Sequence, residues 1–201
     1  APPLPLPFAD DFESYSEGGL NGLSPNGTNV WAALDAVVQT NTVNTGSKAV
    51  SLTSSNAYAR QIFNDGQTNV WTDLYVQPAF GADDGSVDVP EAGSSFAFYV
   101  NTSSNVVVYD GTTQTALAQT VSAGQWVRFT VRSDYTTRTW DLHMGGVKPA
   151  VAAGLGFYDT NAAACTEFGV RGGGASGSAH ADDVNITLND PLLPSTTTTS
   201  T

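Results

Sequence analysis

The side chains of this sequence that could transfer protons or attack a substrate form no recognised catalytic arrangement. Hydrolysis of a glycosidic bond needs two carboxyl groups roughly 5 to 9.5 Å apart on one surface. No Glu-x-Asp-x-x-Glu strand occurs, and no glutamate pairs with an aspartate at that spacing; the glutamates are Glu13, Glu17, Glu91 and Glu167. His143 and His180 stand neither in a Ser/His/Asp arrangement nor at a metal-ligand spacing. The sequence therefore predicts a protein that is not an enzyme.

A second kind of chemistry, sugar recognition, fits the polar and aromatic residues better. Sugar rings stack their C–H faces on Trp and Tyr, and their hydroxyls bond to charged and amide side chains. The candidate ligand-binding residues lie on the polar sides of alternating segments: Tyr58, Arg60, Trp71, Asp73, Tyr75, Tyr99, Trp126, Arg128 and Arg132. In the alternative interpretation the rings cover a second apolar layer and the arginines pair with neighbouring acids. The sequence leaves open whether these segments share one sheet.

The charge balance excludes several classes of partner. The 201 residues include 19 acidic and 7 basic ones, which gives a net charge of −12. Binding to nucleic acid or to an anionic membrane surface needs clustered Lys and Arg. The single Cys165 rules out an internal disulfide, and no apolar run is long enough to span a bilayer. A surface rich in Ser, Thr, Asn and Gly favours a secreted or cell-surface protein.

The elements that must position these residues are short strands. In residues 126–132 the apolar Val127, Phe129 and Val131 alternate with polar side chains, which is the period of a half-buried strand. Similar runs, separated by turn signals, occupy residues 58–63, 70–77, 95–101, 105–109, 139–144, 166–170 and 182–188. The only helix candidate, residues 30–38, is short and poorly capped. The pattern predicts an all-β fold, an antiparallel two-sheet β-sandwich of the jelly-roll type.

Composition divides the chain into three parts. Residues 1–7 alternate Pro with small apolar residues and predict an extended, Pro-rich N-terminal extension. Residues 8–190 form the sandwich domain. Residues 191–201 are rich in Pro, Ser and Thr, which is typical of a linker or tail and favours a covalently linked neighbouring domain.

Three short motifs resemble a known group of modules. They are Phe8-Ala-Asp-Asp-Phe-Glu-Ser-Tyr15, Gly46-Ser-Lys-Ala-Val-Ser-Leu52 and Ala181-Asp-Asp-Val-Asn-Ile-Thr-Leu188. In this order they resemble the opening, following and closing strands of concanavalin/laminin-G-like jelly rolls, including family 4 and family 22 type carbohydrate-binding modules. The resemblance spans roughly residues 8 to 188 and implies a lectin-like, secreted module.

The resemblance also implies a structural calcium ion. In such jelly rolls the first and last strands are neighbours, which would bring Asp11 and Glu13 near Asp182 and Asp183. Clustered carboxylates repel one another unless a cation neutralises them, and Ca²⁺ accepts carboxylate and carbonyl oxygens. The expected metal ligands are Asp11, Glu13, Asp182 and Asp183 with backbone carbonyls of Ser47 and Lys48. In the alternative interpretation these acids cap loops and accept backbone N–H groups.

The leading hypothesis is a non-catalytic module of a secreted multi-domain protein that binds a polysaccharide or oligosaccharide and contains structural Ca²⁺. A second hypothesis is a laminin-G-like structural or adhesive domain that binds protein or acts as a spacer. A third is a divergent polysaccharide lyase or glycoside hydrolase. In jelly-roll lyases an Arg, a Gln-x-His pair and a Tyr-x-Lys pair do the chemistry, and here Phe63 stands where the His would be after Gln61.

Overall fold

Strands form nearly all the regular structure, as the period-two pattern predicts. The computed structural model describes residues 4–81, 90–173 and 178–193. The predicted extension and linker therefore lie partly outside the described residues, at 1–3 and 194–201. Residues 30–38, the helix candidate, instead hold the strands β3 (Ala32–Leu34) and β4 (Ala36–Gln39). The one helical turn of the described chain is the 3₁₀ helix η1 (Ala150–Ala152).

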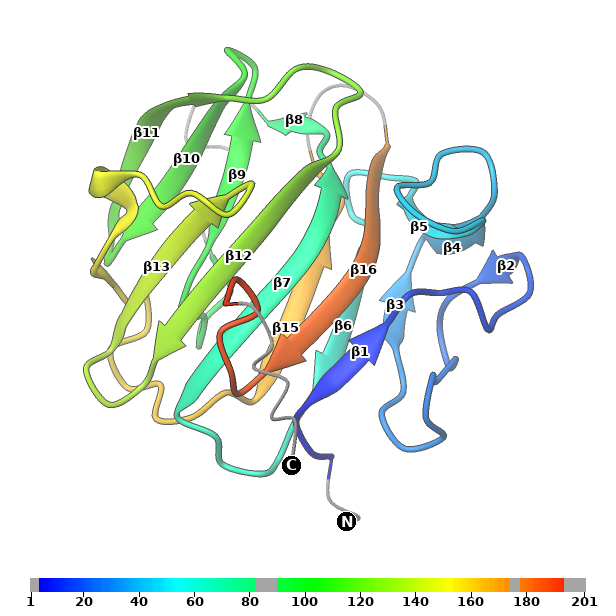
Figure 1. Ribbon diagram of the computed structural model, residues 1–201, viewed down its shortest axis with the longest axis horizontal. Coiled ribbons are helices and arrows are strands. Elements are labelled where there is room, and N and C mark those ends of the chain that lie inside the picture. Colours follow the sequence, from blue (N-terminus) through cyan, green and yellow to red (C-terminus); the bar gives the residue numbers. More distant parts are fainter. Residues whose placement is uncertain (1–3, 82–89, 174–177, 194–201) are drawn as a thin grey trace, which may run out of the picture.

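The largest sheet has nine strands and forms the front layer in Figure 1. Its strand order is β14-β13-β12-β7-β16-β5-β4-β2, and β1 pairs with β16 beside β5. The bounds not yet given are β1 (Phe8–Asp10), β2 (Gly18–Gly19), β5 (Ala49–Leu52), β7 (Asn69–Gln77), β12 (Val127–Asp134), β13 (Thr139–Met144), β14 (Leu155–Gly156) and β16 (Ala179–Thr187).

Two smaller sheets lie behind the large one (Figure 1). The first has the order β11-β10-β9-β8, with β8 and β9 parallel. The second has the order β15-β6-β3. Their strands are β6 (Tyr58–Ile62), β8 (Phe80–Gly81), β9 (Phe98–Asn101), β10 (Asn105–Asp110), β11 (Thr113–Thr120) and β15 (Glu167–Arg171). The predicted antiparallel β-sandwich is confirmed, with its second layer divided in two.

The core lies between the layers and explains why the strands alternate. Phe129 and Val131 point into it from β12 and are buried. From the four-stranded sheet, Phe98 contacts Phe129 with ring centroids 4.9 Å apart. From the first strand, Phe8 packs edge-on against Trp31 at 5.6 Å. Burial of such rings is the main stabilising contribution, and it forces the alternate residues of each strand to the outside.

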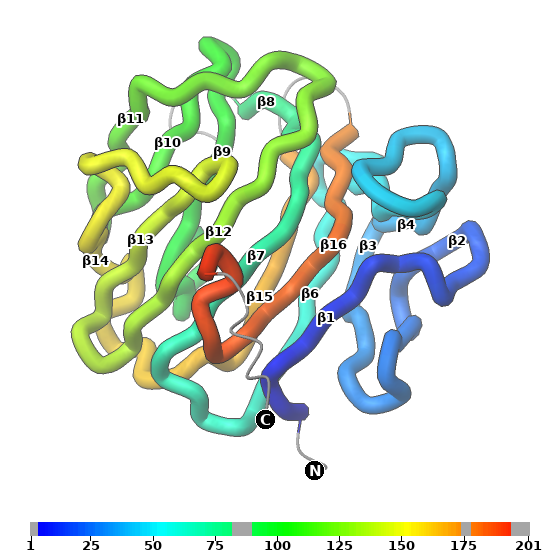
Figure 2. Tube along the Cα trace, viewed as in Figure 1, coloured from blue at the N-terminus to red at the C-terminus, as the bar shows by residue number. Residues whose placement is uncertain are grey.

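The first and last strands are neighbours, as the resemblance implies. Phe8 of β1 pairs with Ile186 of β16, and Asp10 pairs with Val184. Figure 2 shows the N-terminal segment running beside β16 along the sheet. No helix of the described residues is long and apolar enough to cross a membrane.

Candidate functional site

The outer side of the large sheet brings together predicted ligand-binding residues from two strands. On β7 the side chains of Trp71, Asp73 and Tyr75 point away from the core, because Val70 and Leu74 point into it. On β12 the residues directly opposite are Arg132, Thr130 and Arg128, in that order. We call this surface, made by Trp71, Asp73, Tyr75, Arg128, Thr130 and Arg132, the polar face.

An ion pair spans the two strands at the centre of the polar face. Arg128 donates from Nε to Asp73 Oδ1 at 2.9 Å and from Nη2 to Oδ2 at 2.8 Å. The Thr130 hydroxyl donates to the same carboxylate at 2.6 Å. The hydrogen bonds with Asp73 raise the pKa of Arg128. This bidentate pair fixes the register of β7 and β12. The Arg128 N–H groups, which were predicted to bind a ligand, are therefore already bonded to Asp73.

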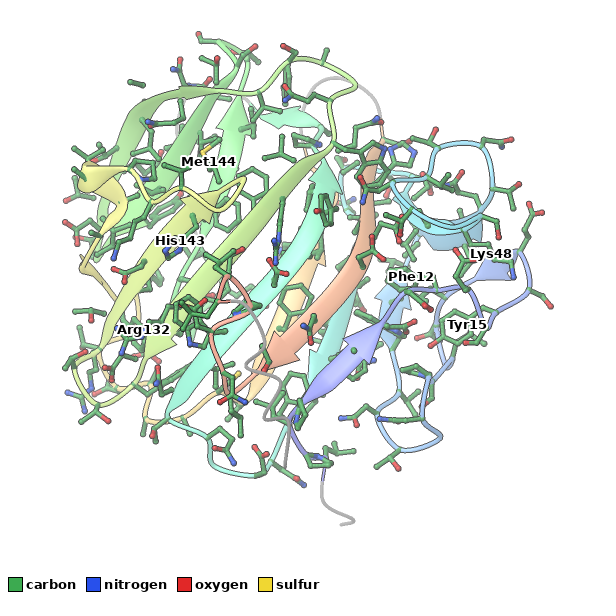
Figure 3. All side chains as sticks on the ribbon, in the orientation of Figure 1. Phe12, Tyr15, Lys48, Arg132, His143 and Met144 are labelled. Carbon is green, nitrogen blue, oxygen red and sulfur yellow. The ribbon has the colours of Figure 1, made fainter. Side chains whose placement is uncertain are left out.

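Two tryptophan–histidine contacts lie on the same side of the sheet. His143 of β13 lies opposite Thr130, and its ring centroid is 5.9 Å from that of Trp71. At the other end, Trp126 precedes β12 and lies 6.3 Å from His180 of β16. Burial lowers the pKa of His180. In Figure 3, Arg132 of β12 and His143 of β13 both lie in front of the large sheet. Both histidines therefore support aromatic rings, a role that the sequence spacing alone did not indicate.

A hollow of about 460 Å³ opens at the Trp126 end of the polar face. Tyr75, Trp126 and Arg128 line it together with Met144, Val127 and Gly145. Gln125 and Thr120, from the turn and strand before β12, add hydrogen-bonding groups at its rim. Tyr75 and Trp126 are both partly exposed. An aromatic hollow with amide and hydroxyl groups at its rim matches the surface that a sugar ring needs.

Three predicted ligand-binding residues lie on the other two sheets. Tyr58 and Arg60 are on β6, where the Arg60 guanidinium lies 5.3 Å from the centre of the Tyr58 ring and 3.8 Å from Glu167. Tyr99 is on β9 and donates a hydrogen bond to Gln114 at 3.1 Å. The structure does not bring them to the polar face, because their strands belong to the opposite layer.

A larger cavity of about 770 Å³ lies between the layers. Its walls include Leu74, Phe98, Phe129 and Phe168, which also build the core. Two hydroxyls among the residues around it, those of Ser95 and Tyr135, bond to each other at 3.1 Å. Polar and charged side chains line it as well, including three predicted ligand-binding residues, Tyr58, Arg60 and Tyr99, together with Glu91, Glu167 and Arg171. We take the polar face as the candidate site because it and the adjoining Trp126 hold the other six predicted ligand-binding residues.

The predicted metal ligand Glu13 holds the loop between β4 and β5. Its Oε1 accepts the backbone N–H groups of Ser47 at 2.9 Å and Lys48 at 2.8 Å, and Oε2 accepts the Ser47 hydroxyl at 2.7 Å. These bonds, led by the Ser47 hydroxyl, lower the pKa of Glu13. A side chain at Gly46 would overlap the same carboxylate, and the backbone there has φ +63°. Glycine is therefore favoured at this position.

The closing aspartates hold the same loop from the other side. Asp182 is fully buried, and its carboxylate accepts backbone N–H groups of Asn44 at 2.9 Å and Thr45 at 3.2 Å. Burial raises the pKa of Asp182 to about 6. Asp183 accepts the Thr45 hydroxyl at 2.8 Å and the Asn44 amide at 3.2 Å.

These contacts do not fit a calcium ion bound by the residues as the sequence predicts. Because Lys48 N–H points at Glu13, the Ser47 carbonyl of the same trans peptide points away from it. The Lys48 ammonium donates to the carbonyls of Glu13 at 2.8 Å and Tyr15 at 2.6 Å, so a positive charge already lies here. Asp11 is exposed and accepts the Glu13 N–H at 3.2 Å. Among the described residues no group of three or more acids, histidines or cysteines could hold a metal. Calcium stays a prediction from the sequence.

Sequence reasoning missed the buried carboxylate of Asp10. It accepts hydrogen bonds from the Tyr15 hydroxyl at 2.6 Å, the Trp31 indole at 2.7 Å and the Phe12 N–H at 2.8 Å. Burial raises the pKa of Asp10. The alternation of the strand could have predicted its burial, because the side chain of Phe8 points into the core and Asp10 follows Phe8 by two residues. Figure 3 shows Phe12 and Tyr15 near this end of β1, with Lys48 close by.

Comparisons with known proteins bear on the fold alone. No protein-family model matches the chain, and no curated protein matches it in sequence. A solved sialidase is similar in structure, with a TM-score of 0.60 and 10% identity over 92% of this chain and 18% of the other. Trypanosoma rangeli sialidase in complex with sialic acid gives 0.56 and 8% identity, covering 85% of this chain and 30% of that one. A Trypanosoma rangeli sialidase mutant with trans-sialidase activity has a TM-score of 0.54 and 6% identity, over 80% of this chain and 27% of the other.

The chain spans less than a third of the length of these sialidases. What the likeness defines is a class of fold, the two-layer antiparallel β-sandwich, which also occurs within those larger chains.

Proposed function

We propose that this chain is a non-catalytic carbohydrate-binding β-sandwich that holds a glycan on the polar face. The observation that carries the proposal is the hollow formed by Tyr75 and Trp126, with Gln125 and Thr120 at its rim. The rings offer flat surfaces to C–H groups, and the rim offers donors and acceptors to hydroxyls. The resemblance to family 4 and family 22 type modules supports the same function.

The proposal extends to the setting of the domain. Its polar, weakly charged composition supports an extracellular location, and the Pro/Ser/Thr-rich residues 191–201 support a covalent connection to another domain. The lack of a Glu-x-Asp-x-x-Glu strand and of a Ser/His/Asp arrangement in the sequence supports a binding role without catalysis. Product release from a polysaccharide panel would contradict that part of the proposal.

Affinity electrophoresis through gels containing neutral and anionic polysaccharides tests the binding function. We expect at least one polysaccharide to retard the protein, and Trp126→Ala to weaken retention about tenfold. A stacked aromatic contributes about 0.5–1.5 kcal/mol beyond its area, and about 1.4 kcal/mol is a factor of ten. The comparison variant is Tyr99→Ala, which removes a ring that lines the cavity between the layers and so tests that alternative site.

The panel should include sialylated glycans, because one structural neighbour was solved with sialic acid. Equal retention of the Trp126→Ala and Tyr99→Ala variants would place the site elsewhere. If no polysaccharide retards the folded protein, the carbohydrate-binding proposal fails and the structural or adhesive domain becomes the better reading.

A further inference from the structure

The second layer of the sandwich is split between β15 and the four-stranded sheet. No strand pairing among the described residues joins the two small sheets. In Figure 1, β9 and β15 both lie behind the large sheet, on either side of β12 and β7. The cavity of about 770 Å³ is lined by Leu74 and Phe129 of the large sheet, by Phe98 of β9 and by Phe168 of β15. All three sheets therefore contribute to its walls, and it lies where the second layer is divided.

Apolar side chains that pack against the core stay partly exposed around this cavity. In strands away from it such side chains are inaccessible, as Leu142 of β13 and Ile186 of β16 are, each with 0% exposed. The partly buried hydrophobic residues that both pack against the core and line the cavity are Val76, Ala79, Phe96, Phe98, Ala162 and Val170. Apolar surface in contact with water costs free energy, and a ligand that covers this surface removes that cost.

The charged side chains around the cavity already have partners. Arg171 of β15 forms an ion pair with Glu91, and Arg60 of β6 lies 3.8 Å from Glu167. These four side chains are each at least 38% exposed, so they form the rim of the cavity and not its floor. Asp159 accepts the N–H of Asn161 at 2.8 Å. The pairing of opposite charges at the rim favours a ligand without net charge.

Aromatic rings and two hydroxyls determine the chemistry of the interior. Phe96 and Phe98 stack with ring centroids 6.5 Å apart and an angle of 20° between their planes. The hydroxyls of Ser95 and Tyr135, both buried in the wall, bond to each other at 3.1 Å, so neither requires a polar group from a ligand. Aromatic side chains gain from stacked or edge-on contact with another ring. The walls therefore favour an aromatic ligand.

We propose that the cavity between the layers is a second binding site, which takes a small neutral molecule with an aromatic ring. Its volume lies within the roughly 300–1,000 Å³ of sites for small organic ligands. The ligand covers the partly exposed Phe96, Phe98, Val76 and Val170. This inference is independent of the proposed function, because the polar face lies on the outer side of the large sheet and the cavity on its inner side.

Fluorescence titration with N-phenyl-1-naphthylamine tests the inference. This neutral aromatic probe becomes brighter in an apolar site, and 1-anilinonaphthalene-8-sulfonate has the same ring system with a sulfonate added. We expect saturable binding of one molecule of the neutral probe per chain. We expect the sulfonate to bind at least about tenfold more weakly, because burial of an anion without a partner is costly.

Val170→Phe should weaken binding of the neutral probe by about tenfold, because the inserted ring occupies space that the probe needs. The matched control is Val147→Phe, which makes the same change in the loop after β13, where Val147 is 69% exposed. Ala79→Leu is a second, smaller change that also fills part of the cavity. It replaces Val170→Phe if that variant shows no cooperative thermal transition.

The absence of saturable binding of the neutral probe would overturn the inference. So would equal probe affinities in the folded cavity-filling variants and Val147→Phe. An affinity for the sulfonate equal to or above that for the neutral probe would overturn the assignment of a neutral ligand. None of these results bears on glycan binding, which Trp126→Ala tests on the other side of the large sheet.

Discussion

Asp73 and Asp182 are both buried carboxylates on the large sheet, yet their surroundings give them different chemistry. Asp73 has a full positive charge beside it, from Arg128 at 2.8 Å. Asp182 receives backbone N–H groups from Asn44, Thr45 and Asp183. Such dipoles stabilise a carboxylate less than a paired cation does. Burial therefore dominates at Asp182 and raises its pKa.

We predict that Asp182→Asn changes how stability depends on pH. The pKa of Asp182 rises from 3.8 to about 6 on folding, so between these values the folded chain binds a proton that the unfolded chain does not. Its stabilising contribution is complete below about pH 3.8 and is lost as the pH rises through 6. Between pH 7 and 4.5, the Tm of the unmodified protein should rise by about 2–4 °C relative to the variant.

Thermal melting at several pH values measures this difference. Glu13→Gln is a useful comparison, because the contribution of Glu13 to stability depends on pH in the opposite direction. The pKa of Glu13 is lowered by its bonds to Ser47 and Lys48, so its contribution is present above about pH 4.5 and lost below it. If the Asp182→Asn protein and the unmodified protein show parallel Tm curves from pH 7 to 4.5, the proton is not held at Asp182.

At the scale of elements, sequence patterns predicted faces well and sheet membership poorly. Alternation correctly put Trp71, Asp73 and Tyr75 on one side of β7, because the side of a strand depends only on neighbouring residues. Tyr99 could not be assigned in this way, because its strand β9 pairs with the adjacent β10, and the local pattern does not tell whether that hairpin belongs to the large sheet or to the opposite layer. The burial of Trp71 could not be predicted either, because it depends on side chains far along the chain, such as His143 of β13.

We predict that Gly172→Ala destabilises the β15 end of the three-stranded sheet. The new Cβ would overlap the Ser54 carbonyl and lie 3.0 Å from the Ala57 side chain, while the Gly172 N–H is held by the Ala57 carbonyl at 2.8 Å. Backbone atoms cannot move aside as a flexible side chain would, so the cost should be about 1–3 kcal/mol. Urea denaturation of the purified variant measures it.

The control is Gly173→Ala, one residue further on, where no atom lies within 4 Å of the added Cβ. We expect this variant to keep the stability of the unmodified protein. Equal losses for the two alanines would mean that glycine matters here for backbone freedom rather than for the close approach of the Ser54 loop.

At the scale of the whole molecule, the clustered carboxylates that contribute to the net charge of −12 do not require a bound cation. Glu13, Asp182 and Asp183 each accept protein donors, and Lys48 brings a positive charge to the same corner. The three motifs predicted the meeting of the chain's first and last strands correctly. They could not show which way the loop peptides face, and that orientation decides what the acids bind.

We therefore expect the Tm of the protein to be the same in EDTA and in excess calcium. A bound ion stabilises the folded state by mass action, so its removal would lower the Tm. Differential scanning calorimetry in the two buffers gives the answer. A Tm that falls by several degrees in EDTA and recovers with calcium would establish the ion that the sequence predicts.

The central place of β16 has a consequence for the rate of folding. This strand pairs with β7, β5 and β1, so the sheet stays incomplete until residues near one end of the chain meet residues near the other. Closing such long loops costs entropy before any contact offsets it, and sandwiches of this kind fold in milliseconds to seconds. Until β16 docks, β7 and β5 present open edges that another chain can pair with. Refolding should therefore lose yield to aggregation as protein concentration rises.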